Sequence, residues 1–331
     1  MNVLSLEKQS AIIAALCEGV SIRSTARLHD VHKNTVMTLG RKVGEGCTAV
    51  HGKLMVEPTG CSHRTGRSVE LRQKERRNVQ EEDPDTVGDQ FIYLAMDSTG
   101  KAILSWYVGK RNFRSTMNFV EDLRYRVVGA PDFSTDGYQP YQRAIDLVFD
   151  TSSHGVVDKQ VVVIAASPDS PKYYARETLV KVERFPMKGT PDHISTSFIE
   201  RQNLTLRMTQ RRLTRLSNGF SKKYENHCAA VALYAMHYNF CRVHETLRIT
   251  PAMQIGVTDH IWSISELVNA ALNGEIQARV AWEKSRFPGD PGWTQLGFCP
   301  LAESGQKGKA ESRQRPGLST RRRGARCDHK S

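Results

Sequence analysis

The sequence predicts an α/β protein in which a mixed sheet with helices follows a small all-α domain. Three observations carry this prediction. The chain opens with three short helical segments, residues 91–108 read as a strand hairpin, and a short strand ending at Asp136 lies between two helical segments. Strands alternating with helices are typical of a mixed α/β core.

The first 45 residues predict a helix-turn-helix domain. Helices are expected over 6–17, 22–28 and 33–43, with Gly19 ending the first and Ser21 capping the second. A tight turn before the third helix is typical of DNA-binding helix-turn-helix motifs. The candidate DNA-binding residues on the third helix are Lys33, Asn34, Thr35 and Arg41. The alternative is a helical bundle that only packs.

The core is expected to begin with a hairpin and to continue as alternating elements. The expected elements are strands 91–96 and 102–108, helix 117–127, strand 132–135, helix 139–149, and strands 161–164 and 182–185. Two long helices, 195–216 and 221–241, and a shorter one, 264–272, should follow. Residues 45–88 carry little pattern.

These elements divide the chain into five predicted parts. They are a helix-turn-helix domain (1–45), a linker (46–85), an α/β core (86–216), a C-terminal helical region (217–275) and a disordered basic tail (276–331); the resemblance described below implies that the core is catalytic and that the linker holds its degraded first strand. The tail has no recognisable counterpart.

The charge of the chain points to a polyanionic partner. The formal net charge is +12 at pH 7, and residues 301–331 hold nine Lys or Arg against three Asp or Glu. The seven cysteines form no C-x-x-C pair, which fits a reducing, cytoplasmic compartment. No apolar stretch is long enough to predict a membrane span. Double-stranded DNA is the expected partner.

Two acids are the candidate catalytic and metal-binding residues. Asp136 ends a strand in the segment Ser134–Tyr141, and Glu200 lies near the start of a helix that then becomes basic. Carboxylates delivered from a strand end and a helix can share a divalent ion. Separately, Asp136 could be an ordinary turn residue and Glu200 a solvated helix acid.

The helix after Glu200 carries a candidate phosphate-binding stripe. Leu204, Arg207, Arg211 and Arg215 follow at steps of three and four residues, roughly along one helical face. The basic residues assigned to DNA in this helix are Arg201, Arg207, Arg211, Arg212 and Arg215. The alternative is a solvated charged face.

Several of these segments resemble one family of bacterial proteins. The segments are LSLEKQSAIIAALCEGVSIRSTARLHDVHKNTV (4–36), STDGYQPY (134–141), HISTSFIERQNLTLRMTQRRLTRLSNGFSKKYENH (193–227) and ALYAMHYNFCRVHETLRITPAM (232–253). They resemble the insertion-sequence-one family of DDE transposases over about residues 1–60 and 79–275. The order of elements likewise looks like a ribonuclease-H-like fold.

The resemblance implies a polynucleotidyl transferase that cuts element ends and joins them to target DNA. Three carboxylates would hold two Mg²⁺ or Mn²⁺ ions, with Asp136 as the second acid and Glu200 as the third. Such enzymes generally act as homo-oligomers on paired DNA ends. Activity and fold are expectations that the resemblance supplies.

The first carboxylate of that set is missing from its expected strand. Residues 63–74 read HRTGRSVELRQK, where the family has an acidic, aromatic strand. Asp97 is the nearby acid that could substitute, although it lies in a hairpin turn. We hypothesise a pair of compensating frame changes, because codons for Gly66–Arg72 can be chosen that encode Asp-Asp-Arg-Trp-Ser-Phe-Val one nucleotide later. Sequencing the coding DNA tests this hypothesis.

Two alternatives to an active transposase remain open. One is a non-catalytic helix-turn-helix protein, a transposase remnant that binds DNA without cutting it. The other is a transcription regulator, which the segment Ser197–Asn203 disfavours.

Overall fold

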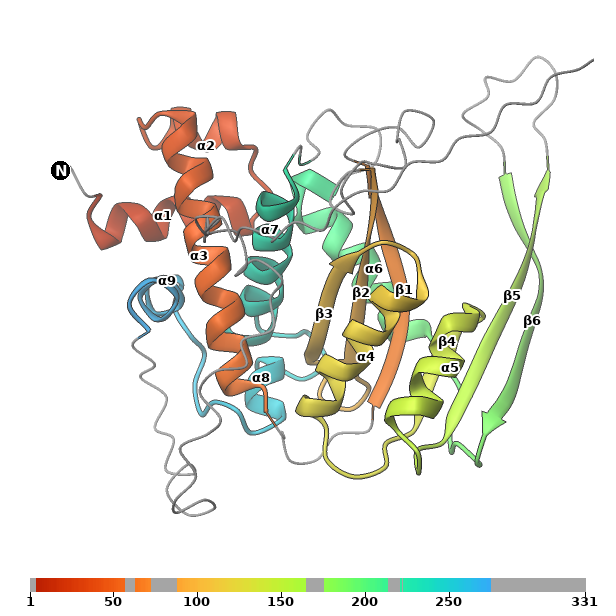
Figure 1. The fold of residues 1–331 in the computed structure, drawn as a ribbon. Coiled ribbons are helices and arrows are strands. Elements are labelled where there is room, and N and C mark those ends of the chain that lie inside the picture. Colours follow the sequence, from red (N-terminus) through yellow and green to blue (C-terminus); the bar gives the residue numbers. More distant parts are fainter. Residues whose placement is uncertain are drawn as a thin grey trace, which may run out of the picture. The chain divides into compact units, whose positions relative to one another are not determined.

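The protein combines N-terminal helices, a small mixed set of strands with helices beside them, and C-terminal helices (Figure 1). The computed structural model describes residues 4–56, 63–72, 88–164, 176–213, 221 and 223–274. The α/β class predicted from the sequence is confirmed. The basic tail predicted over 276–331 lies outside the described residues.

The three N-terminal helices are α1 (Leu6–Cys17), α2 (Ile22–Leu28) and α3 (Lys33–Leu54). Side chains cap each one: Ser5 accepts from the Lys8 amide, Ser21 from the Ser24 amide, and His32 from the Asn34 amide. The third helix was expected to end near residue 43 but runs eleven residues further.

Packing explains the extra length of α3. Val43, Cys47 and Val50 recur at helical spacing and are buried, and α3 contacts both α7 and α9. The glycines of this segment, which weaken a helix, obscured the pattern in the sequence.

The first sheet is antiparallel, in the order β1-β2-β3. Its strands are β1 (His63–Arg72), β2 (Asp89–Asp97) and β3 (Ile103–Gly109). The hairpin predicted over 91–108 is confirmed. The expectation that the segment before it had lost its strand is wrong for the backbone, because residues 63–72 pair with β2 along its length. Main-chain hydrogen bonds, which any sequence without proline can supply, explain how a polar segment is accepted here.

The second sheet has the order β4-β5-β6. Its strands are β4 (Phe133–Asp136), β5 (His154–Ile164) and β6 (Arg176–Lys188), with β4 and β5 parallel and β6 antiparallel to β5. Helices α4 (Phe113–Arg126) and α5 (Gln139–Val148) flank β4 in the chain, and β1 contacts β4. The expected strand 161–164 is therefore the end of β5, and the expected strand 182–185 is the middle of β6; the polar residues of both strands hid their full length.

The C-terminal part is helical. Its elements are α6 (Ser197–Thr209), a 3-10 turn (Arg211–Leu213), α7 (Tyr224–Met236), a π-helical turn (His237–Cys241), α8 (Pro251–Gln254) and α9 (Ile264–Asn273). The long helix expected over 195–216 is wrong at its end. Gln210 is extended, and the Thr209 carbonyl lies against the Gly19 turn, where an added Cβ would be 2.7 Å from its oxygen.

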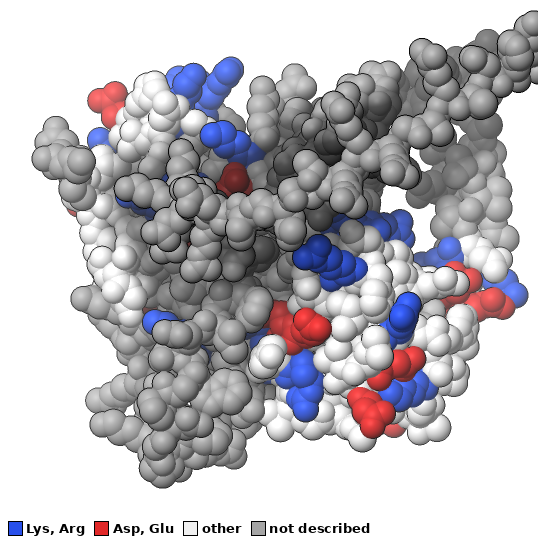
Figure 2. Space-filling model, in the orientation of Figure 1, with Lys and Arg blue, Asp and Glu red and all other residues white. Residues whose placement is uncertain are grey.

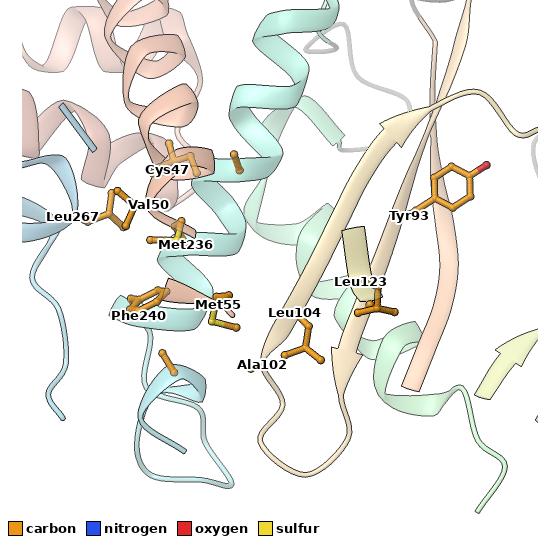
Figure 3. Close-up of a cluster of buried hydrophobic side chains, with 14 of the residues drawn as sticks. Cys47, Val50, Met55, Tyr93, Ala102, Leu104, Leu123, Met236, Phe240 and Leu267 are labelled. Atoms are coloured by element: carbon orange, nitrogen blue, oxygen red, sulfur yellow. The ribbon is translucent and has the colours of Figure 1, made fainter. Parts of the chain in front are cut away.

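One hydrophobic core joins the N-terminal and C-terminal helices to the first sheet. Figure 3 shows side chains from α3, α7 and α9 beside side chains from β3 and α4. The labelled members include Cys47, Val50, Leu104, Leu123 and Leu267. The first three helices therefore share their core with the rest of the described fold. Among the described residues, no helix is long and apolar enough to cross a membrane.

Candidate functional site

Asp136 is the last residue of β4 and begins the turn into α5. The strand residues before it are buried, and its Oδ1 accepts a hydrogen bond from the Tyr138 amide at 3.3 Å. Pro140 then occupies the first turn of α5. Burial, followed by the charge of the Asp136 carboxylate, raises the pKa of the Tyr141 hydroxyl well above its usual value.

Glu200 lies in the first turn of α6, where a carboxylate is favoured by the helix dipole. Two groups bind the same carboxylate oxygen, Oε1. The Thr196 hydroxyl donates to it at 2.7 Å, and the Lys159 ammonium of β5 forms an ion pair with it. Glu200 is therefore oriented by its own helix and linked to the second sheet.

The strand register places Asp136 and Lys159 on one face of the second sheet. Asp136 pairs with Val157 across the parallel β4–β5 ladder, and paired residues point to the same face. Lys159, two residues further along β5, shares that face and lies about 7 Å beyond Val157. Because Lys159 binds Glu200, the structure brings the two predicted acids to the same part of this face.

The segment that leads into α6 covers the same face. Ser134 of β4 donates to the His193 carbonyl at 3.2 Å, and an added Cβ on Gly155 would meet Ile194. Ser134 and Gly155 lie two residues before Asp136 and Val157, so they belong to the same face as those two residues. The placement of Glu200 over the end of β4 therefore rests on several contacts besides the ion pair.

Asp97 lies at the other end of the first sheet. It is buried at the end of β2 and accepts from the Gly100 amide in the hairpin turn. The turn of Asp136 lies near the beginning of β2, because the Arg111 guanidinium is 5.9 Å from the Phe91 ring and 4.7 Å from the Tyr138 ring. Asp97 lies six residues beyond Phe91 along β2, a distance of about 20 Å. The length of β2 therefore separates Asp97 from Asp136, whereas the hairpin turn of Asp97 reaches the start of α6, where the Lys101 ammonium lies 3.2 Å from the centre of the Phe198 ring.

Strand β1 supplies no aspartate. Its one acid is Glu70, whose Cα pairs with Phe91. Among the described residues, no group of three or more His, Cys, Asp or Glu side chains could hold a metal ion. The residues present therefore do not fit the two-metal set that the resemblance implies. They offer two carboxylates, and an ammonium already binds one of them.

The predicted DNA-reading residues lie at the start of α3. Lys33 and Asn34 are exposed, and Thr35 is half-buried. Arg41 is exposed and forms an ion pair with Glu45 at 2.9 Å, one turn further along the helix. In Figure 2 basic side chains are visible near α2 and the start of α3 with an acidic side chain beside them, and over α4 and α5 basic and acidic side chains also mix.

The basic stripe predicted after Glu200 does not follow one helix, because α6 ends at Thr209. Arg201 is exposed and Arg207 half-buried on α6, and Arg211 is exposed in the 3-10 turn. Arg212 instead turns inward: it is half-buried and donates to the Asn226 carbonyl at 2.8 Å. Burial lowers the pKa of its guanidinium. Arg215 lies outside the described residues.

Sequence reasoning missed Lys159. The segment Asp158-Lys159-Gln160 interrupts the apolar run of β5, and that interruption was the available signal. Its role depends on the register with β4 and on the position of α6, which are tertiary facts.

A cavity of about 380 Å³ lies elsewhere, between the ends of α1 and α6 and the π-helical turn, and is lined partly by Cys17, His237 and Cys241.

Comparison with known proteins adds no assignment. No protein-family model matches the chain, and no curated protein sequence matches it.

Proposed function

We propose that the chain is by descent a DNA transposase of an insertion element, resembling the insertion-sequence-one family. The observation that carries this proposal is the meeting of Asp136 and Glu200 on one face, at the carboxyl end of β4. Two acids placed together, one from a strand end and one from a helix, suit metal-assisted phosphoryl transfer. Either acid alone would suit a merely structural role.

The arrangement of strands supports a ribonuclease-H-like core. In Figure 1 the strands follow in the order β3, β2, β1, β4, β5, β6, with β1 in contact with β4. The β1–β2–β3 pairs are antiparallel and β4–β5 is parallel. This mixed order is the one that the resemblance leads us to expect.

Divalent ions, if bound to such carboxylates, would activate the attacking oxygen and stabilise the leaving one. The chain's own contribution is positional. Asp136 is fixed by its turn, and the Thr196 hydroxyl holds the Glu200 carboxylate toward β5. Since no aspartate lies in β1, the acid set of a DDE transposase is incomplete in this polypeptide.

The second candidate function is DNA binding without cleavage, and two observations favour it. Strand β1 brings no aspartate, and Lys159 binds Glu200. In this reading the start of α3 finds the element ends in double-stranded DNA, and the core occupies them as an oligomer on paired ends. The first candidate describes the descent of the chain, and the second describes the polypeptide as it stands.

A binding and cleavage experiment on the full chain tests both functions. The probes are labelled duplexes taken from the DNA that flanks the coding sequence on each side, with shuffled duplexes of equal length as control. We expect preferential retardation of the flanking duplexes and no strand cleavage with Mn²⁺. Cleavage abolished by Asp136→Asn or Glu200→Gln would establish the first candidate, and equal retardation of the shuffled duplexes would refute both.

A further inference from the structure

We propose that Lys159 acts as the built-in cation of the face that carries Asp136 and Glu200. Its ammonium takes the position on the Glu200 carboxylate that a divalent ion would otherwise take, and so keeps divalent ions off this face. The inference rests on the geometry of the face and needs no DNA bound to it.

The position of Lys159 is fixed by the sheet. It lies within β5, where its backbone pairs with Val182 of β6, and its side chain is 34% exposed. Its partner is held as well, because the Thr196 hydroxyl donates to the same Glu200 oxygen at 2.7 Å. An ion pair between a strand residue and an oriented carboxylate loses less side-chain entropy than one between two mobile side chains.

The described part of this face holds a second cation, because Arg184 of β6 pairs with Val157 and is exposed. Asp136, Glu200, Lys159 and Arg184 therefore sum to zero charge, and Lys159 is bound to Glu200 by the ion pair. Asp158 belongs to the opposite face, where its Oδ1 would lie 3.3 Å from a Cβ added to Gly137. Lys181 of β6 is occupied by an ion pair with Glu183.

A fixed ammonium beside two carboxylates weakens divalent-ion binding in two ways. It must be displaced from the Glu200 oxygen, and it repels the incoming ion. At roughly 6 Å, and even with the dielectric constant of water, one unit charge changes the affinity for a divalent ion about tenfold. Replacing Lys159 by a neutral side chain of similar length should therefore create a divalent-ion site on this face.

The experiment measures Mn²⁺ binding to the full chain by the loss of the free-Mn²⁺ electron paramagnetic resonance signal, without DNA. We expect Lys159→Met to bind one Mn²⁺ at least about tenfold more tightly than the unmodified chain. Lys159→Arg, which keeps the charge, should bind no more tightly than the unmodified chain. Lys181→Met is the matched control, because it removes a lysine of the same hairpin whose acid partner lies outside the site.

The double variant Lys159→Met/Glu200→Gln decides whether the gained site is this one. We expect it to lose the tighter binding while the thermal unfolding midpoint stays near that of Lys159→Met. Unchanged affinity in Lys159→Met, or a gain that survives Glu200→Gln, would overturn the proposal. Since no DNA enters the assay, failure of the chain to bind element ends would leave this result untouched.

Discussion

Gly44 of α3 lies directly against the backbone of Ala229 in α7, so that a Cβ on Gly44 would be 2.2 Å from the Ala229 carbonyl oxygen. Gly46 approaches Ala271 of α9 in the same way, at 1.9 Å. Real Cβ atoms do not come this close to backbone atoms, so both sites require glycine. The helix that carries the candidate DNA-reading residues is therefore packed backbone to backbone against the C-terminal helices.

We expect Gly44→Ala to destabilise the whole described fold. The added methyl must push α3 and α7 apart, which costs about 1–3 kcal/mol or more in a packed core. The measurement is the free energy of unfolding in urea by circular dichroism. The matched control is Gly52→Ala in the same helix, where no atom lies within 4 Å of the added Cβ.

Gly52→Ala should instead be neutral or stabilise the fold by about 0.5–1 kcal/mol, because alanine is the better helix former. Equal effects of the two substitutions would contradict the close packing of α3 on α7.

The start of α3 should carry the affinity for DNA. We expect Lys33→Ala and Asn34→Ala to weaken binding to the flanking duplexes, since both side chains are exposed at the end of the helix that would face DNA. Removing one phosphate contact should lower the slope of log K against log salt by about 1. Fluorescence anisotropy over a range of salt concentrations measures both quantities.

Lys53→Ala is the matched control for this prediction. Lys53 is also exposed on α3 but lies twenty residues further along, about 30 Å from Lys33. A loss of affinity as large as that of Lys33→Ala would mean that net charge, and not the start of the helix, governs binding.

Arg211 and Arg212 should behave differently although they are adjacent. Arg212→Ala removes a half-buried side chain and its charged hydrogen bond to the Asn226 carbonyl, and should lower the free energy of unfolding by about 1–3 kcal/mol. Arg211 is exposed, so Arg211→Ala should leave stability within about 0.5 kcal/mol. Unfolding curves and DNA titrations of both variants check this prediction. If Arg212→Ala weakened DNA binding but left the free energy of unfolding unchanged, the inward placement of Arg212 would be contradicted.

The sequence was sufficient for elements with strong local signals. Ser21, which was predicted as a cap, marks the start of α2, and the hairpin over 91–108 follows from two apolar runs around a turn. The position of Asp136 at a strand end and of Glu200 in a helix was likewise predicted, because both lie within patterned segments.

The rest depended on tertiary contacts. The extension of α3 is stabilised by α7 and α9, which lie far along the chain, and α6 ends where it meets the Gly19 turn. Strand β1 has no alternating pattern, and its pairing with β2 is carried by the backbone. The Lys159–Glu200 pair joins residues 41 positions apart, so no local pattern could indicate it.

A buried histidine should make stability depend on pH. His227 is 3% exposed, and burial, followed by the charge of Arg212, lowers the pKa of its ring to about 3. The unfolded chain therefore binds one more proton than the folded one between about pH 3 and 6.5. The neutral His227 ring makes its full contribution to the free energy of unfolding above pH 6.5. As the pH falls from 6.5 toward 3, the free energy of unfolding decreases by up to about 1.4 kcal/mol per pH unit.

We expect His227→Leu to reduce that slope without lowering stability near pH 8. Among the described residues neither ring nitrogen of His227 has a hydrogen-bond partner, so an apolar side chain loses no bond there. Urea unfolding at several pH values between 4 and 8 measures the slope. The same slope in the variant and the unmodified chain would show that His227 titrates normally when folded.

Restoring an acidic, aromatic first strand should change both stability and activity. The coding DNA should read Asp-Asp-Arg-Trp-Ser-Phe-Val in the frame one nucleotide beyond codons 66–72. A chain rebuilt with that sequence at Gly66–Arg72 should unfold at a higher temperature, because apolar side chains then occupy a strand that contacts β4 and α6. Coding DNA without such a frame would remove the reason for the substitution.

The register of β1 indicates where the new acid would lie. The Cα of Gly66 pairs with Leu94, and the Leu94 side chain packs in the same cluster as Ile199 and Leu206 of α6. Directly paired residues of antiparallel strands point to one face, so an aspartate at position 66 would face α6, the helix that carries Glu200. The rebuilt chain should therefore gain Mn²⁺-dependent cleavage of the flanking duplexes, and the same chain with Asp136→Asn should lose it. Higher stability without cleavage would mean that the strand is structural and that Lys159 still excludes the metal.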